Sequence, residues 1–261
     1  MRKFLIIGIV ICVLLPGCEL GERLDIQRMG DSPGYFIECY CRPDSMYEMT
    51  ATRIAPVAEP QVLDYSLEFD VCILADEPVK LYHSLYFRPG NHFVYNYASS
   101  KRLDVAKVDS LYLEVTAPGG EAIFSETAIP KQVKIDSVTW HGKEITTYFM
   151  SDECEEENYY VLTLSWESEG GNVRTYFLSG FEGREQVKQE YPLSDTVTSV
   201  NVSLKRMTEA GYRYQYSLFE AQNAGTESLF APVELLGNIC GAMGIFTCYT
   251  EDRARVLKSE D

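Results

Sequence analysis

The sequence predicts an all-β protein with two tandem sandwiches of the immunoglobulin or transthyretin type. Tyrosine is abundant, at 18 of 261 residues, and valine, threonine and phenylalanine recur, which favours strands over helices. Many short stretches alternate apolar and polar residues. Turn-forming residues separate these stretches at regular intervals, as they do in sandwiches.

The first sandwich is expected over residues 33–129. Asp44 lies in an Arg-Pro-Asp-Ser turn between the first two strands, and the Gly119-Gly120 pair turns the chain between the last two. The cysteine pair around a core tryptophan that marks immunoglobulin domains is absent. The expected strands are 35–41, 46–54, 65–74, 79–87, 92–98, 110–118 and 121–129.

The second β-rich domain is expected over residues 130–253, with Pro130 at the boundary. Gly170-Gly171-Asn172 is a strong hairpin signal between two of its strands. The expected strands are 133–140, 146–150, 159–167, 173–181, 197–207 and a last one in 240–250. Residues 254–261 are expected to fray.

The segment 208–223 fits two patterns. Tyr212, Tyr214 and Tyr216 alternate as in a strand, whereas Tyr212, Tyr216 and Phe219 have helical spacing. Because Thr208 can cap a helix, we predict one short helix here, packed on the second sheet.

The first residues indicate export and lipidation. Arg2 and Lys3 precede an apolar run of twelve residues, Phe4 to Leu15, which is too short to span a bilayer. The ending Leu-Pro-Gly-Cys resembles a bacterial lipobox, in which the cysteine becomes lipidated. We therefore expect a signal peptide over 1–17, a lipid (palmitate among its chains) on Cys18, a tether over 18–32 and an outer-membrane location, with the face left open.

Charge and cysteine content narrow the possible partners. Loss of Arg2 and Lys3 with the signal peptide changes the net charge from −16 to −18, which argues against nucleic acid as a partner. Export permits disulfides, but we favour buried, apolar roles for the cysteines, with disulfides second and metal ligation last. The cysteines concerned are Cys39, Cys41, Cys72, Cys154, Cys240 and Cys248.

Catalytic patterns are not recognisable. The histidines, His83, His92 and His141, lie in separate segments without a metal-binding pattern, and no Gly-x-Ser-x-Gly occurs. Glycines in 237–244 suit a bulge or a close backbone approach better than phosphate binding. The acidic stretch 151–158 suits a solvated loop better than a calcium site. We therefore expect no catalytic residue, cofactor or metal.

Several segments together resemble a family of Bacteroidota lipoproteins called domain of unknown function 4249. They are the lipobox, "YFIECYCRP", "YNYAS" (95–99), "LEVTAPGGEAIFSETAIP" (113–130), "YRYQYSLFEAQN" and "LFAPVELLGNICGAMGIF" (229–246). Ala242-Met243 departs from the Gly-Leu pair more typical there. The resemblance implies an outer-membrane lipoprotein, often encoded beside TonB-dependent receptors, and it carries no established active-site residues.

Three functions follow as hypotheses. The first is a non-enzymatic accessory lipoprotein that captures ligand for a β-barrel receptor or covers its pore. The second is a pilus-anchor or surface-adhesion module, which requires an exposed edge strand. The third is a glycan-active enzyme, because paired carboxylates are set by spatial separation that sequence does not reveal.

Overall fold

The fold is all-β, as predicted, with a single helix in the part of the chain that is described. The computed structural model describes residues 34–54, 65–87, 94–153, 157–166, 172–194, 196–224 and 233–258. Cys18, His92, Cys154 and the segments 1–17 and 18–32 lie outside these residues. No helix within the described residues is long and apolar enough to cross a bilayer.

The first sandwich is made from one continuous set of strands. These are β1 (Tyr35–Cys41), β2 (Met46–Arg53), β3 (Asp70–Leu74), β4 (Pro78–Phe87), β5 (Val94–Arg102), β6 (Ser110–Thr116) and β7 (Ala122–Ala128). They pair in the order β1-β2-β5-β4-β3-β6-β7. The alternating side chains of β6 and β7 bury every second residue, and both ends of this strand series contribute to one core, with Ile37 from β1 and Ile123 from β7.

The second sandwich has two distinct layers. Its strands are β8 (Ile135–His141), β9 (Glu144–Met150), β10 (Asn158–Trp166), β11 (Asn172–Phe181), β12 (Gln186–Pro192) and β13 (Ser199–Met207). The order β12-β9-β8 forms a three-stranded sheet, and β11-β10-β13 continues into the larger sheet. Trp140 and Phe149 of the small sheet share a core with Leu162 and Val202 of the large one.

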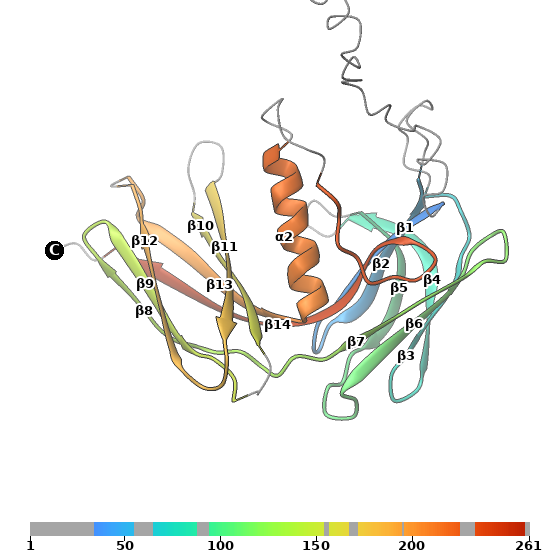
Figure 1. Cartoon of the computed structure of the whole chain (residues 1–261), viewed down its shortest axis with the longest axis horizontal. Coiled ribbons are helices and arrows are strands. Elements are labelled where there is room, and N and C mark those ends of the chain that lie inside the picture. The colour runs from blue at the N-terminus through green and yellow to red at the C-terminus, as the bar shows by residue number, and fades with distance from the viewer. Residues whose placement is uncertain are drawn as a thin grey trace, which may run out of the picture. The chain divides into compact units, whose positions relative to one another are not determined.

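The last strand, β14 (Met243–Leu257), belongs to both sandwiches (Figure 1). Its first part, up to Cys248, pairs in parallel with β1, and its second part, from Tyr249, pairs antiparallel with β13 along the opposite edge. Phe246 accordingly lies in the first core, whereas Val256 packs on the second.

Two expectations for this end of the chain need correction. Strand β14 continues to Leu257, into the segment that was expected to fray, because β13 pairs with it over its whole second part. The division at Pro130 assigns Ala242, Phe246 and Cys248 to the second domain, but these residues from the end of the chain belong to the first core.

The predicted helix is α2 (Glu209–Ala224), which contacts β10, β13 and β14 (Figure 1). The Thr208 hydroxyl accepts a hydrogen bond from the Gly211 amide at 3.1 Å, as an N-cap does. Gly211 allows close packing on β14, because a Cβ there would collide with the Thr247 hydroxyl. The helix therefore lies on the face of β14 that points away from the two cores.

Two glycines near the end of the chain have the structural role predicted for the 237–244 segment. Gly244 has a φ of 115°, and a Cβ on it would overlap the backbone of Ile37. A Cβ on Gly237 would in turn overlap Gly244. The glycines thus let three backbone segments approach closely where β14 begins.

Candidate functional site

A polar pocket of about 430 Å³ lies where β14 passes from one sandwich to the other. The turn after β1, the β7–β8 connection and the middle of β14 all contribute to it. Its lining residues are Arg42, Pro43, Asp44, Gln132, Glu251, Asp252 and Arg253. We call it the junction pocket.

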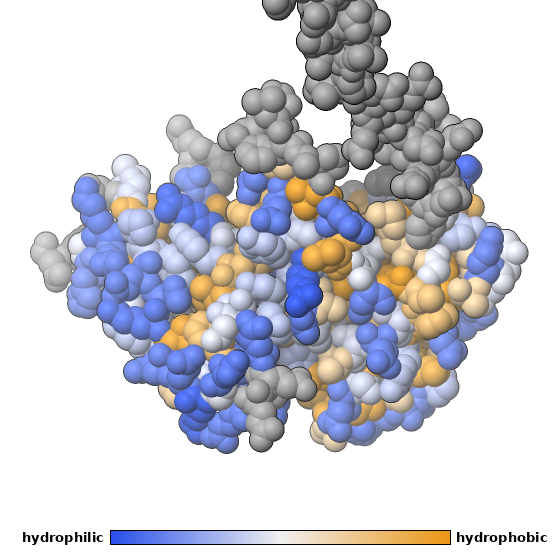
Figure 2. Space-filling model, viewed as in Figure 1, coloured by the Kyte–Doolittle hydropathy of each residue, from blue (hydrophilic) through white to orange (hydrophobic). Residues whose placement is uncertain are grey.

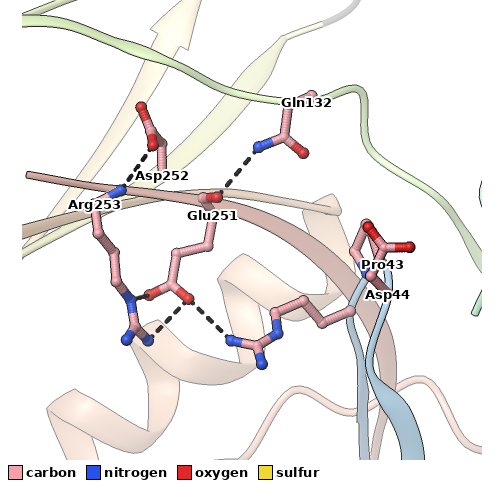
Figure 3. Close-up of a pocket in the computed structure, with 7 residues that line it drawn as sticks. Pro43, Asp44, Gln132, Glu251, Asp252 and Arg253 are labelled. Carbon is pink, nitrogen blue, oxygen red and sulfur yellow. Dashed lines mark hydrogen bonds and ion pairs between the residues drawn. The ribbon is translucent and has the colours of Figure 1, made fainter. Parts of the chain in front are cut away.

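Glu251 is the centre of the junction pocket (Figure 3). Arg253 donates from Nε at 2.9 Å and from Nη2 at 3.0 Å to the two carboxylate oxygens, and the Ser203 hydroxyl donates at 2.6 Å. Arg42 Nη1 lies 3.3 Å from Oε2. The Glu251 side chain is only 6% exposed. Burial alone would raise its pKa, but hydrogen bonds from Arg253 and Ser203 hold the pKa below its usual range.

The other side of β14 anchors the connection between the sandwiches. The Asp252 carboxylate accepts hydrogen bonds from the Ile135 amide at 2.8 Å and from the Arg253 amide at 2.9 Å. Gln132 donates to the Glu251 carbonyl at 3.2 Å. Figure 3 shows the side chains of Glu251 and Arg253 on one side of the strand and those of Asp252 and Gln132 on the other. The pocket therefore has a rigid backbone frame.

Lys205 flanks the junction pocket from β13, where it lies directly across from Glu251. Its Nζ stands 5.1 Å from the ring centroid of Tyr249, a cation–π contact. Burial lowers the pKa of Lys205, an effect that Glu251 opposes and that Arg253 and Arg42 reinforce.

The residues singled out from the sequence are not brought together here. His83 is exposed on β4 and contacts the Tyr65 carbonyl at 2.9 Å, and His141 ends β8. Within the described residues, no three His, Cys, Asp or Glu side chains gather as a metal site would require.

Of the five described cysteines, three are buried as expected and two are not. Cys39 and Cys41 point to the same side of β1, with their sulfurs 3.9 Å apart. They are buried with Cys248 in the first core, which agrees with an apolar role. Cys72 is half-buried and Cys240 exposed, and each of these five described cysteines has a free thiol.

Comparison with known protein families gives one match. A family model described as "domain of unknown function (DUF4249)" matches residues 68–255. The chain belongs to this family. The matched region covers the second sandwich, strands β3 to β7 of the first sandwich and every β14 residue of the junction pocket, while β1, β2 and Arg42 precede it. Curated proteins include no match to this DUF4249 chain.

Sequence reasoning missed the junction pocket. Its residues are far apart in the chain, and the Glu251–Arg253 pair falls at the edge of a segment with no recognised motif. A partial signal was present: Glu251, Arg253 and Lys205 are charged residues within strands that also contain apolar residues.

Proposed function

We propose that this DUF4249 protein is an outer-membrane lipoprotein, anchored through Cys18, that captures ligand for a TonB-dependent transporter without catalysing a reaction. The single observation that carries ligand capture is the junction pocket, which both sandwiches build and β14 holds together. Concave sites with a few fixed polar groups between domains are typical places for small ligands. The lipid anchor and the receptor come from the lipobox and the family resemblance.

The proposal is tested by isolating the protein from native outer membrane under mild detergent. We expect a β-barrel receptor to co-purify with the wild-type chain. A Cys18→Ser variant should lose the membrane association and the receptor together. Extraction of the wild-type protein as a lone monomer would contradict the transporter partnership.

A surface-adhesion module is the second candidate, because the β11 edge of the large sheet is open. Among the described residues, β11 pairs with β10 alone, whereas the β7 edge is covered at Phe124, whose backbone forms two hydrogen bonds with Cys240. Val173 on β11 is 64% exposed. An exposed edge can accept a strand from a partner.

A charged substitution on the β11 edge distinguishes the adhesion function from ligand capture. Val173→Lys should abolish strand addition, because an edge lysine opposes pairing with another chain. Leu257→Lys, at an equally exposed position at the end of β14, is the matched control. Adhesion measured by surface binding that is unaffected by Val173→Lys would exclude β11 as the acceptor.

Figure 2 shows mostly hydrophilic residues on the face drawn, with apolar residues in separate patches.

A further inference from the structure

The two arginines of the junction pocket retain unused hydrogen-bond donors. Arg42 donates from Nε to Ser45 Oγ at 2.9 Å and from Nη1 to Glu251. Arg253 uses Nε and Nη2 on Glu251. Within the described part of the chain, Nη2 of Arg42 and Nη1 of Arg253 therefore have no partner. The Arg253 side chain is 70% exposed and that of Arg42 is 33% exposed, so both can reach an incoming ligand.

Lys205 supplies a third donor whose charge is not neutralised by an ion pair. Its ammonium contacts the Tyr249 ring, and no carboxylate of the described residues lies within ion-pair distance of it. A largely buried cation without a counterion is energetically unfavourable. Folding alone does not explain why this position holds a lysine.

The charges on this side of β14 do not balance. Arg42, Lys205 and Arg253 carry three positive charges, and Glu251 supplies one negative charge among them. Asp44 and Asp252 also line the pocket, so the lining as a whole is not positive. The Asp252 carboxylate lies on the opposite side of the strand from Glu251 and accepts two backbone amides (Figure 3).

We propose that the junction pocket, together with Lys205 beside it, binds an oxyanion, the carboxylate or phosphate group of a small-molecule ligand, through the free donors of Arg42, Arg253 and Lys205. Guanidinium groups bind both oxyanions through charge-assisted hydrogen bonds. The pocket volume of about 430 Å³ accommodates a small ligand around such a group. The oxyanion proposal rests on the proposed function only because it names the class of ligand that would be captured. Anion binding itself does not require a transporter.

Calorimetry with the purified lipidated protein in detergent tests the site. Inorganic phosphate and citrate are the anionic probes, and glucose is the neutral probe. We expect one or both anions to bind and glucose not to bind. Stronger binding of phosphate assigns the site to phosphoryl ligands, and stronger binding of citrate assigns it to carboxylates. Lack of binding by both anions would overturn the proposal.

Two variants with opposite expected effects on anion affinity, Lys205→Met and Glu251→Gln, extend the test. Lys205→Met should weaken anion binding about tenfold, since a charge-assisted hydrogen bond is lost. The matched control is Lys80→Met, because Lys80 is an exposed lysine of the first sandwich that pairs with Asp70 at 2.9 Å. Equal loss in both variants would refute a site at Lys205.

Glu251→Gln should tighten anion binding several-fold, because it removes the one carboxylate that competes for the arginine donors. A purely structural ion cluster would show no such gain, and unchanged affinity in folded Glu251→Gln protein would overturn the proposal. If this variant does not fold, the comparison of Lys205→Met with Lys80→Met decides. Receptor co-purification is measured separately, so anion binding without a receptor would disprove the partnership and leave the site standing.

Discussion

Two glutamates on the same face of the large sheet, Glu38 on β1 and Glu251 on β14, have opposite electrostatic environments. The Glu38 carboxylate accepts a hydrogen bond from the Tyr214 hydroxyl of α2 at 2.8 Å. Burial raises the pKa of Glu38, and the Tyr214 hydrogen bond only partly offsets this. Around Glu251, by contrast, Arg253 and Ser203 overcome burial and lower the pKa.

The difference shows that burial alone does not decide the ionisation of a carboxylate. Glu38 has a neutral partner and lies under a helix, so its environment favours the protonated form. Glu251 has cationic partners and stays charged. The region around Glu38 is therefore suited to holding α2 in place, whereas the region around Glu251 is suited to electrostatic binding.

The largest expected effect on stability comes from displacing α2, which should change the region around Glu38 and leave the region around Glu251 unaltered. In Gly211→Val, the added side chain collides with the Thr247 hydroxyl and with Met207, so we expect a loss of about 2–3 kcal/mol in unfolding free energy. The pKa of Glu38 should fall toward its ordinary value as water enters, while that of Glu251 stays unchanged. Urea unfolding and carboxyl NMR titration measure both. Gln222→Val, at an exposed position of the same helix, is the control; an equal loss there would contradict the close-packing argument.

The next largest effect is expected from a substitution that removes the hydrogen bond from Tyr214 to Glu38. Tyr214→Phe leaves a buried carboxylate without its donor, so we expect a loss of about 1–2 kcal/mol at neutral pH. The folded-state pKa of Glu38 lies above the unfolded one, so its charged form opposes folding, and stability rises as the pH falls through the folded pKa.

The cost of Tyr214→Phe should therefore be smaller at about pH 4 than at about pH 7.5, because the Tyr214 hydrogen bond stabilises the charged form of Glu38. Denaturant melts at the two pH values measure this. Tyr82→Phe changes a tyrosine that is 64% exposed and serves as the control. A cost that does not change with pH would show that Glu38 is not the group involved.

Glu251→Gln should have a smaller effect, which also weakens on acidification. We expect a loss of about 1 kcal/mol at neutral pH, because two guanidinium groups lose their charged acceptor. The folded-state pKa of Glu251 lies below the unfolded one, so its contribution is present above the unfolded pKa and disappears as the pH falls through the folded pKa. A loss that grows on acidification, measured by the same melts, would contradict the ion network.

Much of the fold was accessible from the sequence, because strands and turns have local signals. The alternation in Leu111, Leu113 and Val115 and the cap at Thr208 correctly predicted β6 and the start of α2. Strand β12 was missed, since its stretch of charged residues buries only Val187 and Tyr191. The double pairing of β14 is a long-range property, set by β1 and β13, and no local pattern reports it.

The junction pocket was not accessible for the same reason. Arg42 and Glu251 are separated by 209 positions, and only the parallel pairing of β1 with β14 brings them together. Sequence patterns find groups that lie close along the chain, such as the stretch before Cys18 that resembles a lipobox. They do not find charges that meet through sheet topology.

The smallest expected effect has the opposite sign to the others and concerns Lys205. Lys205→Met keeps the aliphatic length and removes an ammonium that burial and two arginines disfavour, so we expect stability to rise by about 0.5 kcal/mol at neutral pH. Because the pKa of Lys205 is lowered in the folded state, the folded protein binds this proton more weakly than the unfolded chain, and the gain should shrink as the pH rises through the folded pKa. Thermal melts beside Lys80→Met, which removes a paired surface cation, measure the difference. A destabilised Lys205→Met would mean that the lysine supports the fold, whereas stabilisation combined with weaker anion binding is what a residue retained for binding produces.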